Sequence, residues 1–89
     1  MRSKGKKTCG LTFQIGKEAG RAGLYLFVPG TGMWQFLSRQ TGLCLLTWFE
    51  GDGRWFVPDP EEGEPECGHL PNARAALGMA ILRIRRKES

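Results

Sequence analysis

Cys67 and His69 are the two side chains of this 89-residue chain whose types and spacing most readily suggest chemistry. A thiol beside an imidazole can act as a nucleophile, and the same pair can bind zinc. Zinc sites usually combine two such close pairs, whereas the other cysteines, Cys9 and Cys44, stand alone. The carboxylates around Cys67 disfavour its thiolate form. We therefore predict neither a metal site nor a catalytic Cys-His pair, although the sequence leaves open whether these four side chains converge.

The rest of the sequence shows no recognised catalytic pattern. Neither glycine-rich segment has the spacing of a phosphate-binding loop, or the Lys and Ser or Thr that should follow it. The acidic residues gather in one segment, which is typical of a solvated loop more than of a site for a divalent ion. We accordingly predict a binding protein that is not an enzyme and that needs no cofactor.

The charges are unevenly distributed along the chain. Residues 1–21 carry six Lys and Arg against Glu18, and the segment from Arg74 to the end carries five against Glu88. Residues 50–66 carry seven Asp and Glu against Arg54, and the whole chain has a net charge of +4. Two basic ends around an acidic centre indicate a charge-segregated surface that suits a charged partner.

Basic side chains near aromatic rings favour nucleic acid as that partner. Lys and Arg neutralise phosphates, and flat rings stack on bases. The rings that we expect to take part are Trp34, Trp48 and Trp55. The residues that we predict to contact nucleic acid, DNA in particular, are Lys6, Lys7, Arg39, Arg54, Arg83, Arg85 and Arg86.

Turn residues and apolar runs predict a small antiparallel sheet. The segments 29–32, 40–42 and 51–53 have the Pro, Gly, Thr and Asp composition of turns between strands. The strands are predicted at 11–15, 24–28, 33–39, 43–50 and 54–57. Alternation in the last strand puts Arg54 and Phe56 on the sheet face opposite Trp55 and Val57, so Arg54 projects from the open face if a helix covers Trp55.

One helix is predicted at the C-terminal end, from Leu70 to Arg86. Pro71 suits the first helical turn, and the apolar residues that follow recur at helical spacing, as one stripe that packs on a sheet does. The stripe consists of Leu70, Ala73, Ala76, Leu77, Ala80, Ile81 and Ile84. The acidic segment before the helix, residues 58–68, is predicted to be a solvated loop that folding does not require.

A second apolar group lies on the opposite side of this helix. Ala75, Met79 and Leu82 follow one another at helical spacing, and Gly78 stands beside them. Either the helix is deeply buried, or these four residues form a surface for a partner, a second copy of the chain included. We keep Ala75, Gly78, Met79 and Leu82 as candidate partner-binding residues.

These elements together predict one α+β domain over residues 11–89, after a basic, flexible tail over residues 1–10. The domain is a meander of three to five antiparallel strands packed by one C-terminal helix. The meander and helix over about residues 33–87, with Gly53-Arg54-Trp55 at the last hairpin and an Ala-rich helix after it, are similar in outline to sheet-reading DNA-binding domains of the plant AP2 and integrase amino-terminal type. The resemblance implies that the open sheet face contacts DNA.

A protein partner is the alternative to nucleic acid. Glu50, Asp52 and the acidic loop would repel phosphate near the hairpin that carries Arg54. The acidic loop, an exposed aromatic face or a helix face would then bind a basic protein, as in an adaptor or inhibitor of the kind that phages and mobile elements encode. Because the sequence shows neither a membrane-spanning stretch nor a secretory signal, we expect a cytoplasmic protein without a membrane partner.

Overall fold

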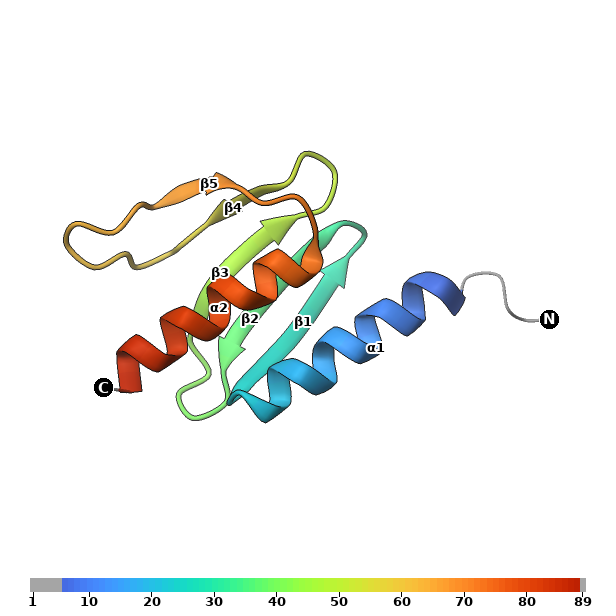
Figure 1. The fold of residues 1–89 in the computed structure, drawn as a ribbon, viewed down its shortest axis with the longest axis horizontal. Helices are drawn as coiled ribbons and strands as arrows, with labels where there is room; N and C mark the ends of the chain where they lie inside the picture. The colour runs from blue at the N-terminus through green and yellow to red at the C-terminus, as the bar shows by residue number, and fades with distance from the viewer. Residues whose placement is uncertain (1–5, 89) are drawn as a thin grey trace.

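The computed structural model describes residues 6–88, which form two helices and five strands (Figure 1). In chain order the elements are α1 (Lys6–Arg21), β1 (Leu24–Gly30), β2 (Met33–Ser38), β3 (Cys44–Phe49), β4 (Arg54–Phe56), β5 (Cys67–His69) and α2 (Ala73–Glu88). The predicted α+β fold, with a small antiparallel sheet and a C-terminal helix, is confirmed.

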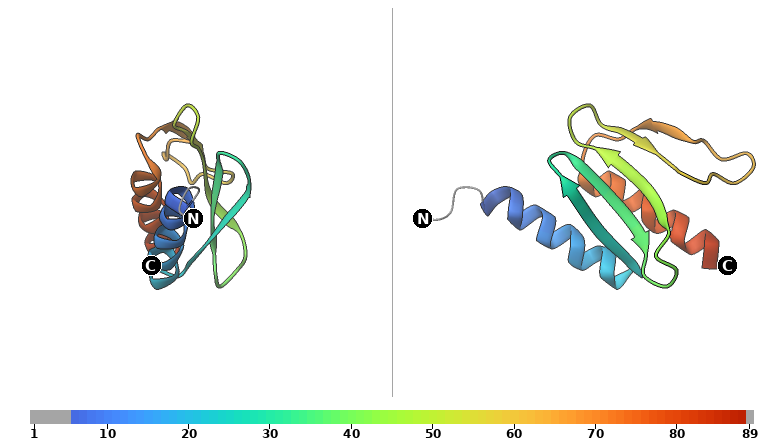
Figure 2. Two further views of the ribbon diagram at one scale, coloured as in Figure 1. Left: turned by 90° about the vertical axis from the view of Figure 1, so that its right-hand side faces the viewer. Right: turned by 180° about the vertical axis from the view of Figure 1, so that it is seen from behind.

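The five strands form an antiparallel meander in the order β1-β2-β3-β4-β5. The register pairs Trp34 with Trp48 and Trp48 with Trp55, so β2, β3 and β4 each turn one indole toward the same face of the sheet. Both helices lie on that face, as the two further views show (Figure 2). The described chain is therefore two-layered, with one sheet face covered by helices and the other left open.

The core fills the space between the helices and the covered sheet face. Phe36 and Leu46 from the sheet and Ile15 from α1 are fully buried there. The apolar stripe predicted for α2 is confirmed, since Ala73, Ala76, Leu77, Ala80 and Ile84 are buried and Leu70 and Ile81 are partly buried against the core. The small alanines let α2 approach the tryptophan rings closely, which places its whole length against the sheet.

The strand predicted at residues 11–15 is wrong, because this segment belongs to α1. The alternation of Leu11, Phe13 and Ile15 is typical of a strand, in which these three side chains would share one face. In α1 they do not, because Ile15 is fully buried whereas Phe13 is 66% exposed. A Cβ atom at Gly16 would lie 3.9 Å from Leu26, an ordinary van der Waals distance, so this side of α1 faces β1. Packing against the sheet overrides the low helix propensity of its glycines.

The acidic segment is tied to the fold and is not a free loop. Residues 67–69 form β5, which pairs with β4, and the Val57 N–H donates to the Glu66 carbonyl at 2.8 Å. The Glu64 side chain reaches α2, where it accepts a hydrogen bond from Arg83. The prediction of a fully solvated loop is therefore wrong for Glu64, because a positive charge on the neighbouring helix draws it in.

The start of α2 is defined by a cap. Asn72 accepts a hydrogen bond from the Ala75 N–H through its Oδ1 atom at 2.9 Å, which satisfies one of the unpaired donors of the first turn. The helix consequently begins at Ala73, whereas the spacing of apolar residues predicted a start at Leu70. Neither helix in the described part of the chain is long and apolar enough to cross a membrane.

Candidate nucleic-acid interface

The fold brings the two basic ends of the sequence into one layer. In α1, four Lys and Arg stand against one Glu, and in α2 five stand against one, so the two helices carry a net charge of +7. Residues 22–72, which contain the sheet and its turns, carry two Arg against seven Asp and Glu, a net charge of −5. The helices therefore form a positive layer on one side of the molecule, which we call the helical layer.

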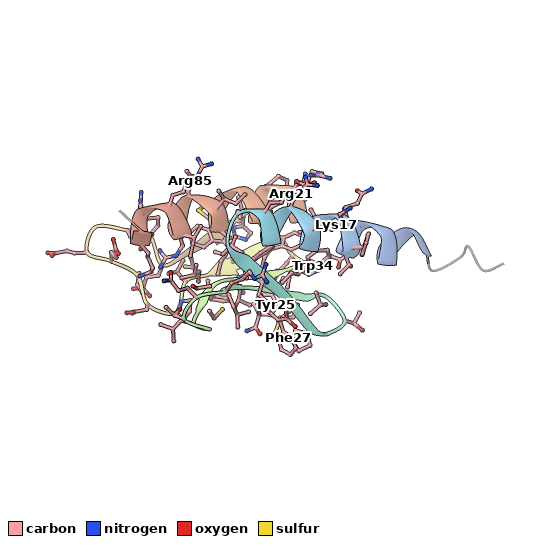
Figure 3. All side chains as sticks on the ribbon, turned by 90° about the horizontal axis from the view of Figure 1, so that it is seen from below. Lys17, Arg21, Tyr25, Phe27, Trp34 and Arg85 are labelled. Atoms are coloured by element: carbon pink, nitrogen blue, oxygen red, sulfur yellow. The ribbon has the colours of Figure 1, made fainter. Side chains whose placement is uncertain are left out.

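The outer surface of the helical layer presents cations from both helices. Lys17 and Arg21 are four residues apart on α1 and thus lie on one face of it, and both are exposed. Arg85 is exposed on α2 and points to the same side of the molecule (Figure 3). Arg74 of α2 donates hydrogen bonds to both carboxylate oxygens of Glu18, each at 2.9 Å. This ion pair joins the helices and neutralises the acid of α1 nearest these cations.

Two cations in the C-terminal half of α2, Arg83 and Arg86, reach the acidic loop. Arg83 is 4% exposed, and besides Glu64 its guanidinium bonds to the Asp59 carbonyl at 3.4 Å. Arg86 also reaches Glu64, at 3.2 Å. The hydrogen bond from Arg83, aided by the Glu61 N–H and by the charges of both arginines, holds the pKa of Glu64 below its usual range. The Arg83 guanidinium is thus buried in contacts within the protein, so it cannot contact a phosphate.

The open face of the sheet presents a row of rings and apolar side chains. Tyr25 and Phe27 project from β1 and are 58% and 45% exposed, and Phe56 on β4 is 40% exposed. Figure 3 shows Tyr25 and Phe27 on the side of the sheet away from the helices, with Trp34 between the two layers. The open face consists of Tyr25, Phe27, Met33, Gln35, Leu37, Cys44, Thr47, Phe49, Arg54, Phe56, Cys67 and His69, as the strand register and alternation place them.

The three tryptophans expected to stack on bases do not reach this face. Trp34, Trp48 and Trp55 are at most 5% exposed and belong to the core, with the rings of Trp34 and Trp48 edge to face at a centroid distance of 6.0 Å. The Trp48 indole N–H donates to the Leu70 carbonyl at 3.2 Å. Composition alone identified aromatic residues as functional, but alternation along the strands assigns the exposed rings to Tyr and Phe.

Arg54 and Arg39 lie at opposite ends of the open face. Arg54 projects from it as strand alternation predicts, and its guanidinium lies 5.8 Å from the centre of the Phe56 ring. Arg39 follows β2 directly, and a Cβ atom at Gly20 would meet its guanidinium at 3.7 Å. Arg39 also lines a shallow hollow with Tyr25, Leu37 and Gly42. One cation thus stands beside each group of rings.

The remaining predicted site residues are dispersed. The side chains of Lys6 and Lys7 lie outside the part of the structure that is described, although both residues belong to α1. On α2, Gly78 and Leu82 are exposed, whereas Ala75 and Met79 are partly buried. Leu82, which is 58% exposed, is the large apolar side chain among the four candidate partner-binding residues that is most open to solvent.

Cys44, Cys67 and His69 all lie on the open side of the sheet. Cys67 and His69 are on the edge strand β5, whereas Cys44 is on β3 and its Sγ lies 3.5 Å from the Thr47 hydroxyl. Among the side chains that the structure describes, no three His, Cys, Asp or Glu residues lie close enough to hold a metal ion. Comparisons of the chain with protein-family models, with curated proteins and with solved structures found no match.

Proposed function

We propose that this chain is a small nucleic-acid-binding protein, not an enzyme, and that its helical layer contacts the phosphate backbone. The observation that carries the proposal is the separation of charge between the layers, +7 on the helices against −5 on residues 22–72. Phosphate contacts supply most of the free energy of non-specific nucleic-acid binding. A layer that concentrates cations on one side of a small protein provides those contacts and steers the encounter with a polyanion.

The acidic residues are arranged so that they interfere little with this layer. Glu18 is paired with Arg74, Glu64 with Arg83 and Arg86, and Glu61 with Lys87 at 3.7 Å. Each of these acids is neutralised by a helix cation within the protein. Lys17, Arg21 and Arg85 project on the side away from the sheet and its acidic turns (Figure 3).

A salt titration with labelled duplex DNA tests the proposal. With about three phosphate contacts, which Lys17, Arg21 and Arg85 can provide, the affinity should fall by roughly one and a half orders of magnitude from 50 to 200 mM salt. The double variant Lys17→Gln, Arg21→Gln should weaken binding and lower the slope of log Kd against log salt by about two. Fluorescence anisotropy measures both quantities.

The matched control removes two cations that lie off the outer surface of the helices, Arg54 on the open face and Arg39 at the edge between α1 and the sheet. Arg39→Gln, Arg54→Gln changes the net charge equally, and it should leave the salt slope for duplex DNA nearly unchanged because neither residue lies on the outer surface of the helices. Equal losses for the two double variants would mean that net charge alone is at work and would refute the proposed surface. A protein that binds no duplex at 50 mM salt would favour a protein partner instead.

A further inference from the structure

We infer that the open face of the sheet is a second binding surface, which takes unpaired bases of single-stranded nucleic acid. This inference is separate from the proposed phosphate-binding layer, because it rests on rings at the opposite side of the molecule (Figure 3). Tyr25 and Phe27 are among the most exposed large apolar side chains of the described residues. Contiguous exposed apolar side chains are rare on soluble proteins and mark binding surfaces.

The rings are arranged in two groups with polar side chains between them. Tyr25 and Phe27 form one group on β1, and Phe49 and Phe56 form the other on β3 and β4, where their rings meet edge to face at a centroid distance of 5.7 Å. The two groups flank the centre of the sheet, where the Gln35 amide donates to the Thr47 hydroxyl at 3.4 Å.

Stacking rings beside an amide and a hydroxyl match the chemistry of a nucleobase. The face of a base stacks on an aromatic side chain, and its edge exchanges hydrogen bonds with groups such as Gln and Thr. Bases within a duplex are already stacked on one another, so a flat sheet cannot reach their faces. The surface is therefore suited to single strands.

The charge of the open face also suits a strand of phosphates. None of the five strands contains Asp or Glu. Arg39 lines a hollow with Tyr25 at one end of the face, and Arg54 lies over the Phe56 ring at the other. A single strand of nucleic acid whose bases stack on both groups of rings passes one cation at each end of the open face. These cations can contact its phosphates beside the stacked bases.

A second copy of the chain is the other occupant that this apolar surface could take. Stacking two such faces would remove Gln35 and Thr47 from water at the middle of the interface and Arg54 at its end, and the Arg54 guanidinium, left without a partner, would oppose association. Nucleic acid avoids this cost because its bases offer partners to the amide and the hydroxyl, and its phosphates offer partners to the guanidinium.

Binding of a fluorescein-labelled oligothymidylate of about 15 nucleotides tests the inference. The double variant Tyr25→Ala, Phe27→Ala should lose about tenfold or more in affinity for this single strand, because base stacking on a ring is strong and two rings are removed. Its affinity for duplex DNA should stay unchanged. The matched control is Leu43→Ala, which removes an apolar side chain that is 66% exposed and does not belong to the open face, and it should affect neither ligand. Circular dichroism and thermal melting of each variant check that the fold is intact.

A covalent map gives a second readout that does not depend on a variant folding. Ultraviolet cross-linking of the parent protein to the same oligonucleotide containing 5-iodouracil should attach it to the peptide that holds Tyr25 and Phe27. The inference is overturned if the double variant binds the single strand as tightly as the parent, or if cross-links fall only on the helices. It is also overturned if sedimentation shows a dimer that the double variant dissociates, since a second copy then occupies the face. None of these results bears on the duplex titration, so the two proposals fail separately.

Discussion

Glu64→Ala should destabilise the protein strongly, although the residue stands in a segment of Pro, Gly and Glu. The substitution leaves the Arg83 guanidinium, in a side chain that is 4% exposed, without its carboxylate partner. Removing one partner of a buried ion pair costs about 3–5 kcal/mol, because the other charge stays buried and unpaired. The Nε atom of Arg83 already lacks a hydrogen-bond partner among the described residues, so little remains to compensate apart from the bond at 3.4 Å to the Asp59 carbonyl.

Water that enters the vacated space will reduce this cost, so we expect about 3 kcal/mol, the lower end of the range. A domain of this size has a total stability of roughly 4–13 kcal/mol, hence the variant should still fold at room temperature. Urea unfolding followed by tryptophan fluorescence measures the difference, and Trp55 reports on the region because it lines the same hollow as Glu64 and Arg83. Glu62→Ala removes an exposed acid of the same loop and serves as the control.

Replacing both partners separates the ion pair from the burial of a charge. Glu64→Leu with Arg83→Met removes the charge together with its partner, and its cost should be well below that of Glu64→Ala. The reasoning is refuted if Glu64→Ala costs less than about 0.5 kcal/mol, or no more than Glu62→Ala, because Arg83 would then not depend on this carboxylate.

Four further outcomes follow from the same structure. Because the pKa of Glu64 is lowered in the folded state, its carboxylate stabilises the fold at pH values above the unfolded-state pKa of about 4.5. This contribution is lost as the pH falls through the folded-state pKa. Melting temperatures measured from about pH 5 down to pH 3 should therefore fall less in Glu64→Gln than in the parent. Leu77→Ala should cost about 2–4 kcal/mol in urea unfolding, since the side chain is buried against the sheet. Gly53→Ala should cost about 2 kcal/mol or more in the same assay, because Gly53 has a φ of +76° and an added Cβ would lie 2.7 Å from the Leu70 carbonyl oxygen. Glu61→Gln should tighten binding to duplex DNA in the anisotropy assay, because it releases Lys87 from its ion pair.

The parts of the fold with local signals could be predicted from the sequence. Pro and Gly turns separate β1 from β2, and the Gly51-Asp52-Gly53 turn separates β3 from β4, so these four strands were located to within a few residues. The apolar stripe of α2 was equally clear, because one face of that helix packs on the sheet along its whole length. Strand alternation also placed Arg54 and Phe56 correctly on the open face.

The parts that depend on tertiary contacts could not be predicted in this way. Three glycines within α1 argue against a helix, and α1 forms in spite of them because Ile15 and Ala19 are buried in the core. β5 has no β-forming residue in Cys67-Gly68-His69, and it is a strand because β4 offers an edge to pair with. Gly68 faces the Trp55 indole so closely that a Cβ atom would lie 2.8 Å from its Nε1.

The candidate site, like the fold, could be predicted where residue types decide it and not where tertiary contacts do. Residue types and charge along the chain indicated nucleic acid, and they identified Arg39 and Arg54 as candidates. They did not show that α1 and α2 share one layer, because that depends on a helix at the N-terminal end that propensity disfavours. They also favoured the tryptophans as stacking rings, whereas Trp34 and Trp55 are core residues and the exposed rings belong to Tyr25, Phe27 and Phe56.

The charge distribution of the folded chain explains why so small a protein needs its acidic segment. Eighty-nine residues bury little apolar surface, and α2 ends in four cations within five positions, Arg83 to Lys87, that repel one another. Glu64 and Glu61 lie against these cations, and their loop closes over the end of the helix. The acids thus pair with cations of α2, whereas Lys17, Arg21 and Arg85 project from the outer surface of the helical layer. The acidic loop, which in the linear sequence argues against binding a polyanion, in the folded chain neutralises Arg83, the cation that packing would otherwise bury without a partner.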